Sequence, residues 1–173
     1  MESSGAPQAV LVTGAFGSGK TSVIQEIADI LEGRGLAYAA VDLDWLTWFH
    51  APDSGESPHH RMLLMNLADL TENYLTAGVR YFVLARSLRH QVELDELRNQ
   101  LAMPVTVVGL SVPLETIEER LSSNVTSARK ADLLGVRERI ASSSGVVTDL
   151  TVDNDRAIRE VATEILGRLG WVH

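Results

Sequence analysis

Residues 14–21 constrain the fold of this chain more than any other feature of its sequence. They read Gly-Ala-Phe-Gly-Ser-Gly-Lys-Thr, which is a complete G-x-x-x-x-G-K-[ST] motif. The run before the motif, residues 9–13, is short, apolar and β-branched, as is typical of a buried parallel strand. The residues after it, 21–31, place apolar side chains at helical spacing. The sequence therefore predicts a strand, a glycine-rich turn and a helix in direct succession.

This arrangement predicts a site for the phosphates of a nucleoside triphosphate. Glycines let backbone N–H groups converge on an anion at the positive end of the helix dipole. Lys20 can reach the β- and γ-phosphates, and the Thr21 hydroxyl can ligate Mg²⁺. The alternative is a turn that merely joins strand and helix, and the flanking patterns favour the phosphate site. The expected nucleotide-binding residues are Gly14, Ala15, Phe16, Gly17, Ser18, Gly19, Lys20, Thr21 and Ser22.

Length and composition limit the class of protein. A chain of 173 residues with 45% hydrophobic content is long enough for one well-packed core and too short for two ordinary domains. We therefore expect one domain over residues 1–173, with a flexible N-terminus at residues 1–8. The formal charge of -8 argues against a nucleic-acid partner and favours small-molecule partners. The sequence has no cysteine, which excludes disulfides, a thiolate nucleophile and a zinc–cysteine site.

The sequence also bears on location and assembly. Its first residues lack a basic region followed by an apolar core, and no stretch has the ~18 consecutive apolar residues of a membrane span. We expect a cytoplasmic protein without a membrane partner. Monomer and homodimer both remain open.

Strand and helix patterns alternate along the chain, which predicts a parallel sheet covered on both faces, with ligands at the carboxyl ends of the strands. Strands are expected at residues 9–13, 36–41, 81–85, 105–110 and 146–152. Helices are expected at residues 21–31, 60–76, 92–101, 113–121 and 155–169, with a polar helix or loop-helix at 127–140.

Two aspartates follow the second expected strand. Asp42 and Asp44 flank Leu43, and the two-residue period of a strand aims both carboxylates the same way. One carboxylate can hold Mg²⁺, directly or through water, and the other can accept the proton of an acceptor hydroxyl during phosphoryl transfer. The alternative is a helix N-cap plus a solvated acid, because Asp44 directly precedes Trp45.

Aromatic side chains cluster directly after this pair. Trp45, Trp48 and Phe49 have the spacing of a helical turn, so they either line an acceptor pocket or, as is more common for such spacing, pack in the core. The stretch 51–58 that follows is rich in Pro, Gly, Ser and acid and indicates an exposed loop. The histidines that border it are interpreted as solvated loop residues without a metal site: His50, His59 and His60.

Phosphoryl transfer also needs positive charge on the migrating group. Arg86 and Arg89 follow the third expected strand, where either can contact acceptor or phosphate. Arg120 and Arg129 bracket a polar stretch within an expected lid region at about residues 120–141. The alternative for each arginine is a surface ion pair.

The loop Gly-Ala-Phe-Gly-Ser-Gly-Lys-Thr and the segment Val-Asp-Leu-Asp-Trp together resemble the small P-loop kinases. This group includes shikimate, gluconate and adenylylsulfate kinases and chloramphenicol phosphotransferase, which are relatives of the nucleoside monophosphate kinases. The resemblance is closest to uncharacterised ATP-binding members of the group. It implies an α/β fold of the P-loop NTPase type, a three-layer sandwich with a five-stranded parallel sheet. It also implies ATP- and Mg²⁺-dependent phosphoryl transfer to a hydroxyl of a small metabolite or antibiotic.

The resemblance implies roles for individual residues. Residues 14–21 would bind ATP and Mg²⁺, and 151–154 would approach the adenine. Thr21 and Asp42 would support the metal. Arg120 would match the lid-side arginine and contact the nucleotide. The expected catalytic residues are Lys20, Asp44 and Arg120, and the expected acceptor-binding residues are Asp44, Trp45, Arg86 and Arg89.

The sequence departs from the group in two respects. The expected lid has no arginine between Arg120 and Arg129. The third expected strand is followed by Arg86, with no aspartate of the Walker B kind, which places more of the metal role on Asp42. These two departures keep a second hypothesis open: a nucleotide-binding regulatory or adaptor protein that has no acceptor substrate.

Overall fold

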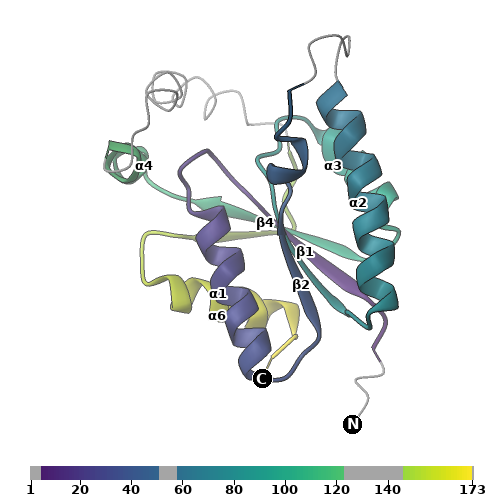
Figure 1. Ribbon diagram of the computed structural model, residues 1–173. Helices are drawn as coiled ribbons and strands as arrows, with labels where there is room; N and C mark the ends of the chain where they lie inside the picture. Colours follow the sequence, from purple (N-terminus) through teal and green to yellow (C-terminus); the bar gives the residue numbers. More distant parts are fainter. Residues whose placement is uncertain (1–4, 51–57, 123–145, 173) are drawn as a thin grey trace.

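One parallel sheet organises the chain in the computed structural model, which describes residues 5–50, 58–122 and 146–172 (Figure 1). Its five strands run in the order β2-β3-β1-β4-β5, and every neighbouring pair is parallel. The strands are β1 (Gln8–Thr13), β2 (Tyr38–Asp42), β3 (Tyr81–Ala85), β4 (Val105–Ser111) and β5 (Leu150–Asp153). The expected α/β fold with a five-stranded parallel sheet is confirmed.

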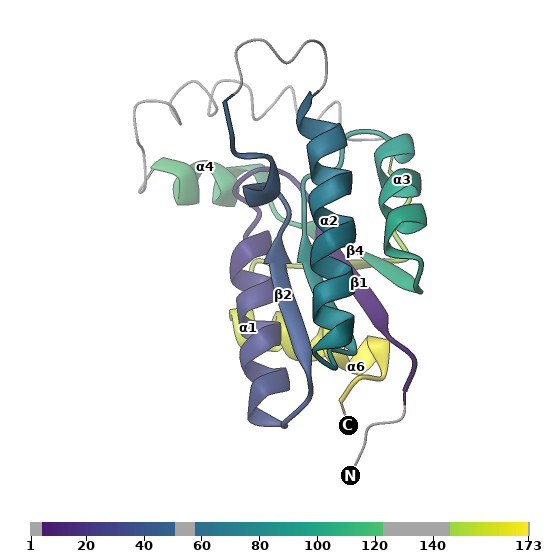
Figure 2. The same ribbon diagram turned by 45° about the vertical axis from the view of Figure 1, so that its right-hand side comes forward.

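Helices cover both faces of the sheet, because each parallel connection must cross from one end of the sheet to the other. Helices α1 (Lys20–Gly33) and α6 (Ile158–Leu169) lie on one face, and α2 (Pro58–Thr76) and α3 (Gln91–Leu101) lie on the other (Figures 1 and 2). Two further elements follow strands at the carboxyl edge: the short 3₁₀ turn η1 (Trp45–Thr47) and helix α4 (Leu114–Ser122).

The central strand β1 shows why its sequence is apolar throughout. Val10 and Val12 pack into the core that contains α1 and α6, whereas Ala9 and Leu11 pack into the core that contains α2 and α3. Side chains alternate between the faces of a strand, and both faces are covered here. Full burial of an aliphatic side chain such as Leu11 stabilises the fold by about 1.5–3 kcal/mol.

Most element bounds agree with the sequence patterns, and the differences have local causes. Strand β1 begins at Gln8, inside the segment that we expected to be flexible, because its N–H donates to the Arg80 carbonyl over 2.9 Å. Strand β5 begins at Leu150 rather than at residue 146. Just before it, the Asp149 carboxylate accepts the Val107 N–H over 2.7 Å. A side-chain oxygen thus takes the place of the backbone carbonyl that a longer strand would offer to β4. The expected helix at residues 127–140 lies outside the described residues.

The sheet order places the site. Strand β1 lies between β3 and β4, and such switch points in open parallel sheets form a crevice at the carboxyl ends of the strands. In register, Ala85 pairs with both Val12 of β1 and Asp42 of β2. The ends of β1, β2 and β3 therefore meet at one edge, beside the loop that enters α1.

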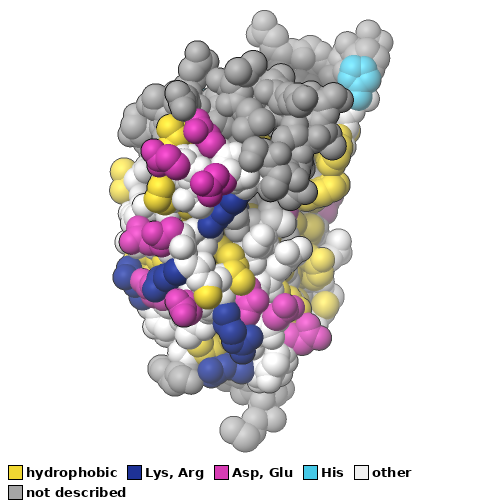
Figure 3. Space-filling model, turned by 90° about the vertical axis from the view of Figure 1, so that its left-hand side faces the viewer, with side chains coloured by type: hydrophobic (Ala, Val, Ile, Leu, Met, Phe, Trp, Pro, Cys, Tyr) yellow, Lys and Arg dark blue, Asp and Glu magenta, His cyan; other side chains and the backbone are white. Residues whose placement is uncertain are grey.

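The surface around α1 and α6 carries mixed charge. Figure 3 shows acidic and basic side chains interspersed on the face that lies to the left in Figure 1. Arg159 of α6 pairs with Glu26 of α1 over 3.1 Å, and Arg168 pairs with Glu164 over 2.6 Å. Within the ranges that the structure describes, no helix is long and apolar enough to cross a membrane.

Candidate active site

The loop between β1 and α1 has the geometry of a phosphate cradle. Gly19 has a φ of 90° and directly precedes the first residue of α1. A Cβ at Gly19 would lie 2.7 Å from Asn154 Nδ2, and a Cβ at Gly14 would lie 2.9 Å from Ser18 Oγ. Both the backbone conformation and the space therefore require glycine. This close packing leaves the loop N–H groups at the N-terminus of a 14-residue helix, where an anion is stabilised.

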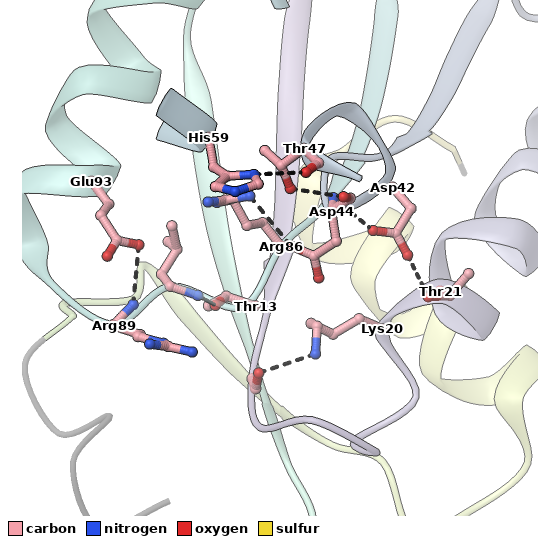
Figure 4. A network of polar contacts seen from close by, with 12 residues as sticks. Thr13, Lys20, Thr21, Asp42, Asp44, Thr47, His59, Arg86, Arg89 and Glu93 are labelled. Carbon is pink, nitrogen blue, oxygen red and sulfur yellow. Dashed lines mark hydrogen bonds and ion pairs between the residues drawn. The ribbon is translucent and has the colours of Figure 1, made fainter. Parts of the chain in front are cut away.

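Lys20 lies folded against this loop. Its side chain is only 8% exposed, and its Nζ donates to the carbonyls of Gly14 over 3.2 Å and Ala15 over 3.0 Å (Figure 4). Burial lowers the pKa of Lys20, while the nearby carboxylates of Asp44 and Asp42 raise it. An ammonium held by two loop carbonyls can exchange them for phosphate oxygens.

Thr21 and Asp42 meet at the edge of the loop. The Thr21 hydroxyl donates to Asp42 Oδ2 over 2.6 Å, which joins the first turn of α1 to the end of β2 (Figure 4). Both groups offer hard oxygen ligands, and Mg²⁺ in nucleotide sites binds one or two such protein oxygens together with phosphates and water. The donor set therefore fits Mg²⁺. The described ranges contain no group of three or more His, Cys, Asp or Glu residues placed to hold a metal ion.

Asp44 continues the same chain of contacts. Its N–H donates to Asp42 Oδ1 over 3.1 Å, and its backbone carbonyl accepts the Thr47 hydroxyl over 2.9 Å. Asp44 is the N-cap residue of η1, as the alternative interpretation expected, but its carboxylate makes no capping hydrogen bond there. Instead, Asp44 Oδ1 accepts from Arg86 Nη1 over 3.3 Å (Figure 4).

The surroundings of Asp44 shift its pKa. Loss of solvent around the carboxylate is the largest cause and raises the pKa of Asp44 above its usual value, and the charge of Asp42 raises it further. The cations Arg86, Lys20 and Arg89 act in the opposite direction, with Arg86 the strongest of them. Asp44 is therefore a more basic carboxylate than an isolated aspartate.

A cavity of about 690 Å³ opens beside the loop, which is within the usual size of small-molecule sites. It is bounded by the phosphate loop, by the turn after β2, by the segment after β3, and by the first turns of α2 and α3. Its lining residues are Gly14, Ala15, Phe16, Asp44, Thr47, His59, His60, Arg86, Ser87, Leu88, Arg89, Val92, Glu93 and Glu96. Three of the expected acceptor-binding residues, Asp44, Arg86 and Arg89, thus lie together in one cavity.

The tryptophans lie elsewhere. Trp45 is 64% exposed and Trp48 is 76% exposed, and their rings contact each other with centroids 4.7 Å apart. Core packing, the more common outcome for such spacing, is therefore wrong for both, because a three-residue 3₁₀ turn replaces the expected helical turn. The described lining of the cavity does not include Trp45. Phe49 is half-buried, and its ring contacts the tilted ring of His59 with centroids 4.7 Å apart.

Two histidines belong to the site although the sequence patterns did not indicate it. His59 and His60 lie in the first turn of α2, which begins at Pro58, so their interpretation as loop residues is wrong. His59 Nδ1 lies 3.0 Å from the Thr47 carbonyl oxygen, and His60 Nε2 lies 2.6 Å from Glu96 Oε2. Proline favours the first position of a helix, so Pro58 was the available signal for this earlier start.

Arg120 lies beside the phosphate loop, outside the cavity lining. From the end of α4 its guanidinium donates to the carbonyls of Ser18 over 3.3 Å and Asn154 over 2.7 Å. Asn154 is 1% exposed, and its side-chain N–H donates to the same Ser18 carbonyl over 2.6 Å. The structure thus brings Arg120 and the end of residues 151–154 to the loop. Arg129 and residues 123–141 of the expected lid lie outside the described residues.

This corner also holds polar atoms suited to a ligand. Ser18 Oγ and Asn154 Oδ1 are buried and make no hydrogen bond within the described part of the chain. Buried polar atoms in native proteins almost always have partners, so such orphans fit a site that a polar ligand completes. Thr21 and Ser22, by contrast, are exposed in the first turn of α1 and accessible to a bound phosphate.

Comparisons with known proteins agree with this architecture. No protein-family model matches the chain, and no curated protein does. Solved structures match along almost its whole length. A sugar kinase from Janibacter sp. HTCC2649 is 24% identical over 95% of each chain, with a TM-score of 0.68. A gluconokinase from Sinorhizobium meliloti 1021 is 22% identical, covering 95% of this chain and 93% of that chain, with a TM-score of 0.61.

A third solved structure is the APS kinase of Mycobacterium tuberculosis in complex with AMPPNP and APS. It is 24% identical, covers 95% of this chain and 98% of that chain, and has a TM-score of 0.64. Likeness at these identities establishes the fold. The chain has the fold of the small-molecule P-loop kinases, which confirms the fold that the sequence resemblance implied.

Proposed function

We propose that this protein is an enzyme that transfers the γ-phosphoryl group of ATP, with Mg²⁺, to a hydroxyl of a small metabolite or antibiotic. One observation carries the proposal. The carboxylate of Asp44 lines the cavity, and its residue is joined through Asp42 to the Thr21 hydroxyl at the phosphate loop. A single hydrogen-bonded chain therefore connects the nucleotide side of the site to the acceptor side. The likeness to small-molecule kinases supports the same reading.

Each group of residues has a separate role in the proposed reaction. The loop N–H groups and Lys20 hold the β- and γ-phosphates, and Thr21 and Asp42 hold Mg²⁺. When bound, Mg²⁺ neutralises charge on the phosphates. Asp44 accepts the proton of the acceptor hydroxyl, whose oxygen bonds to the γ-phosphorus as the bond from phosphorus to the β–γ bridging oxygen breaks. ADP and the phosphorylated acceptor are the products. The raised pKa of Asp44 suits a general base.

Three arginines complete the proposed machinery. Arg86 holds the Asp44 carboxylate in place, and Arg89 is close enough to Asp44 to affect its charge state. Figure 4 shows the Arg89 side chain extending away from Glu93 and toward the side of the site that holds Lys20, so we assign it to phosphate rather than to the acceptor. Arg120 fixes the outer side of the loop through Ser18 and serves as the lid-side arginine. We place this reaction in the cytoplasm.

A nucleotide-binding adaptor without an acceptor is the second candidate. The observation that favours it is the residue that follows β3, which is Arg86 and not an aspartate of the Walker B kind. An adaptor needs the phosphate loop but not the Asp44 carboxylate in a cavity, so the cavity favours the kinase.

The test is ATP turnover against a panel of hydroxyl-bearing metabolites and antibiotics, followed by mass spectrometry for the gain of one phosphoryl group. We expect turnover to rise sharply with one acceptor and to fall about 10³-fold or more in Lys20→Ala, because the cation at the migrating group is lost. Tight nucleotide binding with no acceptor-dependent turnover would favour the adaptor.

A further inference from the structure

The wall of the cavity formed by α2 and α3 has a distinct chemistry. It presents His59 from the first turn of α2 and Glu93 and Glu96 from the first turns of α3. Figure 4 shows His59 and Glu93 on the side of the site away from Lys20. This wall therefore faces the part of an acceptor that lies beyond the reacting hydroxyl.

The contact of His59 determines which of its ring nitrogens serves a ligand. The partner of Nδ1 is the Thr47 carbonyl, which can only accept, so Nδ1 carries the proton. With its ring neutral, His59 therefore presents Nε2 as a hydrogen-bond acceptor.

The two glutamates add further acceptors. They are three residues apart on α3 and so share a face of the helix. Glu93 Oε2 accepts the Arg89 backbone N–H over 3.3 Å, and Glu96 Oε2 pairs with His60 over 2.6 Å. Each carboxylate uses one oxygen in these contacts and has accepting capacity left, because two oxygens offer about four lone-pair positions.

Carboxylates predominate on the α2–α3 wall of the cavity, whereas the arginines come from the segment after β3. Arg86 is paired with Asp44, and His60 with Glu96. The Arg89 guanidinium extends away from Glu93, and within the described residues the Glu93 carboxylate accepts from a backbone N–H (Figure 4). The α2–α3 wall is therefore negative and accepting. Leu88 and Val92 supply apolar surface for a carbon skeleton.

We propose that the acceptor of this kinase carries no negative charge and presents hydroxyl or ammonium hydrogens to Glu93, Glu96 and His59. The substrate class is sugars or polyols and their amino derivatives. An anionic group at this wall would lie against the carboxylates of Glu93 and Glu96, and such like-charge contact is costly away from water. Hydroxyl and ammonium groups instead satisfy the free lone pairs. This inference rests on the proposed function.

The test separates acceptors by charge. A small-molecule cell extract is divided by ion exchange into cation-retained, neutral and anion-retained fractions, and each is incubated with the full-length protein and Mg–ATP. Mass spectrometry then detects the gain of one phosphoryl group. We expect products in the neutral fraction, which indicates a polyol or sugar, or in the cation-retained fraction, which indicates an amino derivative. An acceptor found only in the anion-retained fraction overturns the inference and leaves the kinase function intact. Absence of product in all three fractions overturns both.

A variant pair then tests the wall itself with the acceptor so identified. Glu93→Gln should raise KM about tenfold or more with kcat little changed, because one hydrogen bond to a charged group is weakened. Asp95→Asn is the matched control on the same helix, since Asp95 is exposed and bonds to Gln91. Equal KM values for Glu93→Gln and the control would contradict the assignment of this wall.

Discussion

At the scale of single residues, the pairing of Asp44 with Arg86 decides what the site can do. The carboxylate is partly removed from water and lies near Asp42, and both effects raise its pKa. Arg86 opposes them from 3.3 Å. The basicity of Asp44 is therefore a balance that one substitution can shift.

The pH dependence of the reaction should report this balance. A base must be ionised, so kcat/KM should fall as the pH drops through the pKa of Asp44, at a higher pH than for an ordinary aspartate. Arg86→Leu removes the strongest opposing cation and should move this acid limb to still higher pH. Arg89→Leu should move it less, because Arg89 has the weakest of the opposing effects. A pH–rate profile for each variant checks the order, and a larger shift for Arg89→Leu would refute it.

Substitution of Asp42 and of Asp44 should change different kinetic quantities. Asp42→Asn weakens the oxygen set beside Thr21, so it should raise the Mg²⁺ concentration needed for turnover. Asp44→Asn should lower kcat by ~10² to 10⁴ at saturating Mg²⁺, because the proton acceptor is lost. Mg²⁺ titrations of both variants measure the difference. Identical Mg²⁺ curves for the two would remove the division of roles.

At the scale of elements, a side chain joins the neighbouring strands β4 and β5. Asp149 Oδ2 accepts both the Val107 N–H over 2.7 Å and the Arg98 guanidinium over 3.0 Å. The same residue therefore ties the start of β5 to β4 and to helix α3. This junction supports the sheet edge that ends in Asn154, next to the phosphate loop.

Truncation of this residue should destabilise the fold without touching the chemistry. Asp149→Ala leaves the Val107 N–H without its acceptor, which should cost about 1–3 kcal/mol of unfolding free energy. Arg98→Ala removes only a half-exposed ion pair and should cost about 0–1 kcal/mol. Urea unfolding of the two variants measures both values. A larger loss for Arg98→Ala would mean that the ion pair, not the backbone contact, holds the junction.

At the scale of the whole molecule, nucleotide binding should be coupled to stability. The phosphate loop contacts β5 through Asn154 and α4 through Arg120, so a ligand in the loop stabilises distant parts of the sheet. Mg–ATP at 100 times its Kd should add about 2.7 kcal/mol to the free energy of unfolding.

The same ATP concentration should stabilise Lys20→Ala much less, since its phosphate contacts are reduced. Thermal unfolding with and without Mg–ATP checks this expectation. The variant without nucleotide should remain folded, because among the described residues the hydrogen bonds of Lys20 go to two carbonyls of the phosphate loop and join no two elements of the sheet. An equal rise in Tm for both proteins would exclude Lys20 from the phosphate site.

Much of the architecture was predictable because its causes are local in the chain. The phosphate loop is a contiguous motif, and strand and helix periods are read within a few residues, so the parallel sheet and the position of residues 14–21 followed from the sequence. Asp42 lies beside Thr21 because parallel strands end at one edge, and their shared role at Mg²⁺ stays a prediction. The loop, the acidic pair and the arginines after β3 were thus identified as candidates before the fold was known.

Only the tertiary structure decided how the acceptor side of the site is built. His60 meets Glu96 because α2 packs beside α3, and a contact across 36 positions leaves no periodic signal in the sequence. The chain enters the short turn η1 at Asp44, whose carboxylate pairs with Arg86. The same turn leaves the Trp45 side chain exposed rather than in the core. Local patterns specify which backbone forms, whereas the packing of helices on the sheet specifies which side chains meet. One contiguous segment therefore determines the phosphate loop, whereas contacts between residues far apart in the sequence determine the acceptor side of the site.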